Sequence, residues 1–220
     1  MSSKFWHITD VKSTPVKNGT GFINIDFYAR VTGGGDYFPR MFFEFNRQKL
    51  NTIVSRAVNR AGEDFKTIML RNTAETYFVK QKDVRGSLTL RRAYGGNSFN
   101  FTLVSKGERH QLGDYKISPT HPKKGNQLIY GAVKREGDLK PLQHTGDDKP
   151  TGFLMKRAGG KYFPYYRVGP GRKGIRAYIS PLVPQLMKNE RNVREATYEA
   201  QRTFEKRLDY ELATQWGLAP

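Results

Sequence analysis

The chain has 220 residues, contains no cysteine and carries a net charge of +18, because 38 lysines and arginines stand against 20 acidic residues. The lack of cysteine excludes disulfides, thiolate metal sites and a cysteine nucleophile. A charge imbalance of this size repels itself in an isolated monomer, so we expect a nucleic acid or an acidic protein surface to lie beside the chain.

The first segment alternates polar and apolar residues, which is typical of a strand with one buried face. Apolar residues occupy positions 23, 25, 27, 29 and 31. A turn at 32–36 and a second strand-like run at 37–45 predict a β-hairpin. The three glycines of this turn resemble part of a phosphate-binding loop, but no Lys-Ser or Lys-Thr pair and no helix follow directly, so we favour a turn. We interpret residues 1–46 as an N-terminal β-rich arm.

The second segment predicts a long amphipathic helix from residue 50 to residue 69, because apolar residues recur at steps of three and four. The members of this stripe are Leu50, Ile53, Val54, Ala57, Val58, Ala61, Phe65, Ile68 and Met69. We interpret the stripe as core or as a subunit interface. A short helix at 80–88 and an extended stretch at 89–92 follow. Residues 80–92 hold five basic residues and one acidic residue, so we expect one side to pack while the other stays positive.

Residues 94–180 show mostly the pattern of strands joined by long loops. Strands are predicted at 99–103, 128–133 and 174–179, and an exposed loop at 135–151, where Gly, Asp, Lys and Pro are frequent.

Residues 156–176 carry seven basic residues and no acidic one, and Tyr162, Phe163, Tyr165 and Tyr166 lie among them. Basic and aromatic residues together are typical of a nucleic-acid surface. The same pattern fits a β-hairpin with an aromatic core, basic outer faces and a turn at 169–171. Both interpretations stay open at this point.

The last segment predicts a second long helix. Pro184 fits the first turn of a helix, and apolar residues then recur with helical spacing to about residue 216, before Gly217 as a stop. The recurring residues are Val193, Ala196, Ala200, Phe204, Leu208 and Leu212. Six basic and six acidic residues balance between positions 188 and 211, so we expect this helix to make packing or oligomer contacts and not to face DNA.

Together these elements predict an α+β fold. It consists of an N-terminal β-hairpin segment, a long amphipathic helix, a central antiparallel β region and a long C-terminal helix. Residues 47–220 form the main domain in this interpretation.

No catalytic or metal-binding pattern is apparent. The histidines are scattered singly at positions 7, 110, 121 and 144, where surface roles are the commonest. Asp147 and Asp148 lie in a loop without a third carboxylate nearby, so we interpret them as solvated loop acids. Nucleophile-elbow, Walker and Rossmann motifs are absent. Residues 1–10 lack the apolar stretch of a signal peptide, and no segment approaches the roughly 18 apolar residues of a membrane helix. We expect a chain that is not an enzyme and has no cofactor, no metal and no membrane span.

Two blocks of the sequence resemble the prophage minor tail protein Z family, the tail-completion proteins of long-tailed phages. The first block is the helix from Leu50 followed by VKQKDVR at 79–85 and LTLRRA at 88–93. The second is GFLMKR at 152–157, then Arg167-Val168, then ISPLVP at 179–184 leading into the final helix. The resemblance covers roughly residues 50–216, whereas the β-rich segment at 4–45 departs from the family pattern.

The resemblance implies a virion protein at the head-proximal end of the tail, assembled in the host cytoplasm, which completes the tail so that heads can join it. It also implies a homo-oligomeric ring, expected to be hexameric, around the DNA path. The implied partners are other tail and neck proteins (tail terminator, tail tube and head–tail connector) and the end of the genomic DNA in the lumen. Residues 47–220 then form a tail-completion-like α+β domain.

From charge clustering we predict which residues face the DNA. They are Lys80, Lys82, Arg85, Arg91, Arg92, Lys156, Arg157, Lys161, Arg172, Lys173 and Arg176. Two alternatives fit the same features: another virion ring protein, such as a tail terminator or head–tail adaptor, and a free nucleic-acid-binding protein. The second alternative predicts salt-sensitive duplex binding by the isolated chain.

Overall fold

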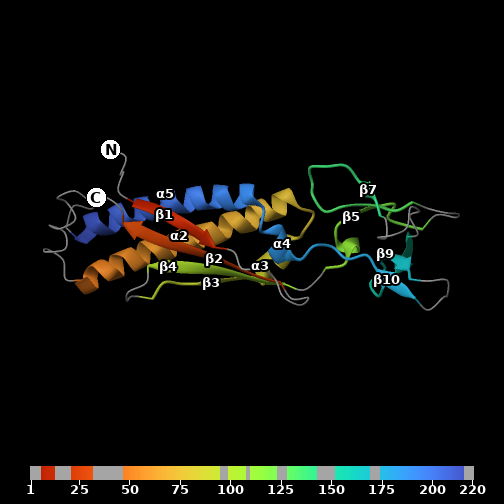
Figure 1. The fold of residues 1–220 in the computed structure, drawn as a ribbon, viewed down its shortest axis with the longest axis horizontal. Coiled ribbons are helices and arrows are strands. Elements are labelled where there is room, and N and C mark those ends of the chain that lie inside the picture. Colours follow the sequence, from red (N-terminus) through yellow and green to blue (C-terminus); the bar gives the residue numbers. More distant parts are fainter. Residues whose placement is uncertain are drawn as a thin grey trace.

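The structure is a computed structural model, and it describes residues 6–12, 21–31, 47–94, 99–107, 110–122, 128–142, 152–168 and 174–215. Its described residues form helices and antiparallel sheets, which confirms the predicted α+β class. The molecule is elongated, with two parts in a row (Figure 1). We call the described residues within 6–107 and 182–215 the body and those within 110–179 the lobe.

Two long helices lie side by side in the body (Figure 1). They are α2 (Arg47–Thr76) and α5 (Glu190–Gln215). Three polar contacts join them. Arg56 donates to Glu211 at 3.3 Å, Thr203 donates to Asp64 at 2.8 Å, and the side chains of Thr76 and Asn192 lie 3.3 Å apart. In these three contacts the residue number on α5 decreases as the residue number on α2 increases, so the two helices run antiparallel.

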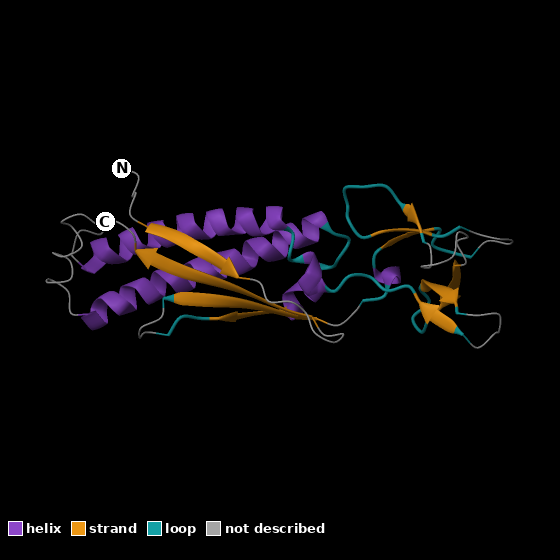
Figure 2. Ribbon diagram, viewed as in Figure 1, coloured by secondary structure: helices purple, strands orange, loops and turns teal. Residues whose placement is uncertain are grey.

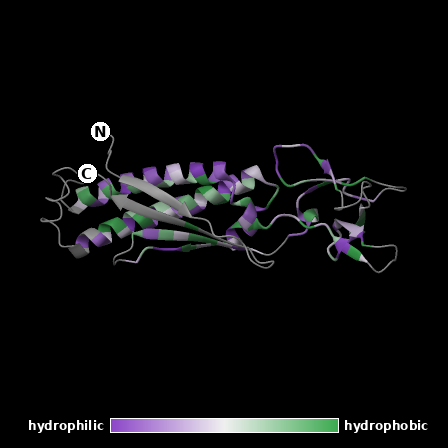
Figure 3. Ribbon diagram, viewed as in Figure 1, coloured by the Kyte–Doolittle hydropathy of each residue, from purple (hydrophilic) through white to green (hydrophobic). Residues whose placement is uncertain are grey.

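The buried residues of the predicted apolar stripes belong to one core that the two helices share. Fully buried alanines, such as Ala57 on α2 and Ala196 and Ala200 on α5, let the two helices approach closely. Phe65 and Phe204 lie in the same core and are 0% and 2% exposed. Figure 3 shows hydrophobic and hydrophilic residues alternating along the ribbons of both helices, as expected when one face is buried. In the described part of the chain, no helix is both long and apolar enough to cross a membrane.

A four-stranded antiparallel sheet packs on this helix pair, with β4 and β3 against α2 and β1 against α5 (Figure 2). Its order is β1 (Trp6–Lys12), β2 (Gly21–Val31), β4 (Asn100–Gly107) and β3 (Leu88–Arg91). Phe101 of β4 packs against Phe65 with ring centroids 5.9 Å apart. A side chain at Gly62 would come within 3.0 Å of the Phe101 ring, so glycine allows this close approach of sheet and helix.

The strand predicted at 22–31 is confirmed as β2, but its neighbours come from elsewhere in the chain. β1 pairs with one edge of β2, and β4 pairs with the other edge over eight residues. The second strand of the predicted hairpin, at 37–45, lies outside the described residues. Both edges of β2 are therefore occupied by strands other than the predicted one.

Two short helices complete the body. α3 (Gln81–Ser87) and the start of β3 at Leu88 confirm the predicted short helix and extended stretch. Pro184 lies in α4 (Val183–Leu186), which is separate from α5. The chain restarts as a helix at α5 because the Asn189 side chain accepts a hydrogen bond from the Arg191 backbone at 3.1 Å, as an N-cap residue does.

The described residues of the lobe form two three-stranded antiparallel sheets and the 3-10 turn η1 (Leu112–Asp114). The first sheet consists of β5 (Lys116–Ser118), β6 (Tyr130–Ala132) and β7 (Lys140–Pro141). The second consists of β8 (Gly152–Lys156), β9 (Tyr162–Arg167) and β10 (Ile175–Ala177). The predicted strands at 128–133 and 174–179 are thus present as the shorter β6 and β10. The predicted loop at 135–151 contains β7, which pairs with β6, and its residues 143–151 lie outside the described chain.

Candidate nucleic-acid interface

The first predicted group of basic residues lies on α3 and β3, and we call it the α3–β3 cluster. Its members are all exposed: Lys80, Lys82, Arg85, Arg91 and Arg92. α3 is held against the body because Val84 is fully buried. The Ser87 hydroxyl also donates to the Val84 carbonyl oxygen at 2.7 Å. With Val84 facing inward, the basic side chains of α3 face solvent.

β3 extends the cluster along the edge of the sheet. Leu88 is buried and Leu90 half-buried, while Arg91 is exposed, because alternate side chains of a strand point to opposite faces. Asn59 of α2 fixes the end of this stretch. Its amide nitrogen donates to the Ala93 carbonyl at 3.1 Å, and its amide oxygen accepts from the Ala93 N–H at 2.8 Å. These paired hydrogen bonds hold the basic stretch against α2.

Arg92 differs from its neighbours because it already has an acidic partner. Its guanidinium donates to Glu63 at 2.7 Å. This hydrogen bond and the charge of Glu63 raise the pKa of Arg92 above its ordinary value. The two side chains are 62% and 39% exposed, so the ion pair adds little to stability. A phosphate has to compete with Glu63, and we expect Arg92 to contribute less to DNA binding than the other members.

The second predicted group lies on the sheet β8–β9–β10, and we call it the lobe cluster. The predicted members are Lys156, Arg157, Lys161 and Arg176, which are exposed, and Arg172 and Lys173, which lie outside the described residues. The turn between β8 and β9 brings Arg157 and Lys161 together, because the Arg157 N–H donates to the Lys161 carbonyl at 3.0 Å. Gly159 and Gly160 have φ values of 98° and 83° in this turn, which glycine adopts without strain.

Two members of the lobe cluster are engaged by neighbouring side chains. The cationic groups of Arg157 and Lys161 each lie 5.3 Å from the centre of the Phe163 ring, within reach of a cation–π interaction. Arg157 also donates to Gln111 at 3.0 Å, and Lys161 forms an ion pair with Asp114 at 3.8 Å. These contacts orient both cations and partly neutralise Lys161.

The aromatic residues beside these cations divide between core and surface. Phe163 is only 7% exposed and packs over Gly113, where any side chain would overlap its ring. The Tyr166 ring lies 4.9 Å from the ring of the buried Tyr178. Tyr165 remains half-buried. The interpretation as a hairpin with an aromatic core and basic outer faces therefore describes Phe163 and Tyr166.

The two clusters do not form one continuous patch. α3 and β3 belong to the body, whereas β8, β9 and β10 lie in the lobe, towards the opposite end of the molecule (Figure 1). Lys80 is the member of the α3–β3 cluster nearest the lobe, because it lines a pocket together with Asp114 of η1.

Two further basic residues, Lys116 and Arg135, lie between the clusters and were not predicted. Arg135 supports the end of α2: its Nε donates to the carbonyl oxygens of Ala74 and Tyr77 at 3.0 and 3.1 Å. The backbone N–H of Arg135 donates to the Thr76 carbonyl at 2.9 Å. α2 has no basic residue in its own last turn, so Arg135 supplies the positive charge that stabilises a helix C-terminus. Lys116 has no basic neighbour in the sequence, and Arg135 lies beside Lys134 in a segment that also holds Glu136 and Asp138, which is why clustering of basic residues along the sequence missed them.

The described residues contain no group of three or more histidine and acidic side chains that could hold a metal ion. Comparison of the chain with protein-family models, with curated proteins and with solved structures found no match.

Proposed function

We propose that this chain is a non-enzymatic structural subunit of a tailed bacteriophage, which completes the tail at its head-proximal end so that the head can join it. The observation that carries this proposal is the packing of the two sequence blocks that resemble tail-completion proteins. The first block includes α2, α3 and β3, and the second leads through α4 into α5. These blocks are far apart in the sequence, yet α2 and α5 share one core. The helices of both blocks therefore share one core, whereas the GFLMKR part of the second block lies on β8 in the lobe.

The polar contacts between the helices support the same conclusion. Glu211 of α5 is almost fully buried, with a side chain 6% exposed, and it binds both Arg56 of α2 and Arg207 of its own helix. A buried carboxylate needs such partners, so this contact specifies how the two blocks align.

The distribution of charge supports a ring around DNA. The α3–β3 cluster exposes basic side chains, whereas the outer face of α5 exposes both signs of charge. Tyr198 and Tyr210 also lie on α5 and are 61% and 50% exposed. Tyrosine is enriched at protein interfaces relative to the rest of the surface. In this proposal, neighbouring subunits contact α5 and the basic clusters face the DNA path, in a ring expected to be hexameric.

Electron microscopy of lysates from a phage that lacks this gene tests the proposal. We expect filled heads and separate, unjoined tails, and we expect joining to return when the wild-type chain is supplied in trans. Mass spectrometry of purified wild-type particles must also find the chain. Joined, infectious particles without the gene would refute the proposal, as would absence of the chain from purified virions.

A further inference from the structure

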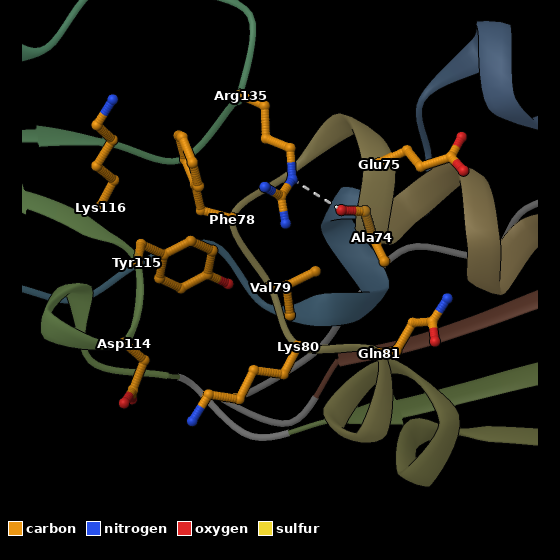
Figure 4. A pocket seen from close by; sticks show the side chains of 10 residues that line it. All are labelled: Ala74, Glu75, Phe78, Val79, Lys80, Gln81, Asp114, Tyr115, Lys116 and Arg135. Atoms are coloured by element: carbon orange, nitrogen blue, oxygen red, sulfur yellow. Dashed lines mark hydrogen bonds between the residues drawn. The ribbon is translucent and has the colours of Figure 1, made fainter.

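The body and the lobe meet across an open pocket of about 770 Å³, within the roughly 300–1,000 Å³ typical of ligand sites. Figure 4 shows its walls: the end of α2, the chain leading into α3, the start of β5 and Arg135. Backbone hydrogen bonds hold these walls together. Phe78 N–H donates to the Val133 carbonyl at 2.9 Å, and Arg135 N–H donates to the Thr76 carbonyl at 2.9 Å. The pocket is therefore built into the connection between the two parts.

Phe78 lies at the centre of the pocket between two cations. The Nζ of Lys116 is 5.4 Å from its ring centre, and the guanidinium carbon of Arg135 is 5.1 Å from it. Val79 and Tyr115 extend the apolar surface beside Phe78. The pocket thus combines an aromatic and aliphatic floor with positive charge at its sides.

These positive charges are available to a ligand. No ion pair within the described residues involves Lys80, Lys116 or Arg135, which come from three different segments of the wall. Arg135 donates its Nε to backbone carbonyls, and no described residue takes a hydrogen bond from its two terminal nitrogens. Asp114, which also lines the pocket, is paired with Lys161 at 3.8 Å. A carboxylate fits between an arginine and lysines of this kind, since the guanidinium can donate two parallel hydrogen bonds to it.

We propose that this pocket binds a peptide segment of a neighbouring protein in which an acidic side chain adjoins an apolar one. The acidic group pairs with Lys80, Lys116 and Arg135, and the apolar group packs against Phe78 and Tyr115. The proposal rests on the proposed function only for the source of the peptide, which is an adjoining subunit of the particle.

A nucleic-acid backbone fits this pocket less well than a peptide. The phosphates of a duplex lie on a convex surface, whereas these cations surround a concave apolar floor. The sugar–phosphate chain has no apolar side chain to cover Phe78 and Val79. A peptide carboxylate can pair with the cations of the pocket, and an adjoining apolar side chain can cover its apolar floor.

Selection from short random peptides displayed on yeast, with the purified full-length chain as target, tests the proposal. We expect enrichment of peptides with Asp or Glu next to Leu, Ile, Phe or Trp. The enriched peptides are then synthesised, and their affinities are measured by fluorescence anisotropy. Enrichment of sequences without acidic residues, or no enrichment, would overturn the proposal.

Paired variants locate the binding. The double change Lys80→Glu and Lys116→Glu reverses two exposed charges at the pocket, and it should weaken peptide binding at least about tenfold. Lys140→Glu is the control, because Lys140 is exposed on the same sheet as Lys116 but does not line the pocket. Circular dichroism verifies that all variants fold. Unchanged peptide affinity in the double variant would refute the proposal. Loss of duplex binding in the single variant Lys116→Glu, which leaves the α3–β3 cluster unchanged, would show a nucleic-acid site at the pocket instead.

The outcome is separate from the test of tail completion. Pocket-dependent peptide binding, together with normal joining in phage that lack the gene, would keep the pocket proposal and refute the tail role. Unjoined tails without peptide binding would do the reverse.

Discussion

Removal of positive charge from the α3–β3 cluster should reduce the salt dependence of duplex binding by a predictable amount. The test variant carries Lys82→Gln, Arg85→Gln and Arg91→Gln. All three side chains are exposed, and none forms an ion pair with a described residue. The apolar residues that hold α3 and β3 in place are untouched, so we expect the variant to fold.

The magnitude follows from counterion release. Each phosphate contact adds about 0.9 to the slope of log Kobs against log salt concentration, so the loss of three contacts should lower the slope by about 2.7. Adding Arg92→Gln should lower it by less than one further contact, because Arg92 is already paired with Glu63 at 2.7 Å.

The assay is fluorescence anisotropy of a labelled duplex at increasing salt concentration. The control variant carries Lys188→Gln, Arg194→Gln and Lys206→Gln, which remove the same charge from exposed positions outside both clusters. We expect the control to keep the wild-type slope nearly unchanged. An equal loss of slope in test and control variants would show that net charge alone drives binding, and the assignment of the α3–β3 cluster would be wrong. Absence of duplex binding by the wild-type chain at low salt would also refute it.

Three other predictions concern stability. Phe204→Ala should lower the free energy of unfolding in urea by about 3–5 kcal/mol, because it leaves a cavity in the core shared by α2 and α5. The control Tyr210→Ala, at a half-exposed position, should change this free energy by less than about 1 kcal/mol. Equal effects of the two variants would contradict the described core. Asn59→Ala should lower the free energy of unfolding by about 1–3 kcal/mol, because it leaves the backbone groups of Ala93 unpaired. Hydrogen exchange of the Ala93 amide should also become faster. Unchanged exchange would show that Asn59 does not hold this stretch against α2. Burial raises the pKa of the Tyr115 hydroxyl above its ordinary value, against an opposing hydrogen bond to Ser180. The unfolded chain therefore loses this proton first, and the stability contributed by the neutral hydroxyl should fall as pH rises from about 10 through the folded pKa. Tyr115→Phe should lose less stability over that pH range than the wild type, and parallel pH profiles would contradict the prediction.

Local patterns in the sequence predicted the elements with one buried face. The steps of three and four in α2 and α5 identify the residues that lie in the core, such as Phe65 and Phe204. The basic residues between the apolar positions of α3 and β3 are exposed, as predicted. Burial of this kind depends on how the side chains of one element alternate around its own axis, and the order of residues contains that information.

Local periodicity does not predict which strands and helices pair with each other, because many segments with the same periodicity are equally suitable as partners. β2 pairs with β4, whose register partners lie far along the chain, and not with the segment that follows it. Arg135 reaches the end of α2 only because β6 and its following residues fold back onto the body.

The same holds for the charged groups of the candidate sites. Phe163 is core and Tyr165 is not, although both follow the same sequence pattern of aromatic and basic residues. The sequence by itself thus predicted apolar core positions of the long helices and of β3, and where the positive charge lies along the chain. The tertiary structure alone decided that this charge forms separate clusters with a pocket between them, because the spacing of distant residues depends on long-range packing and not on local periodicity.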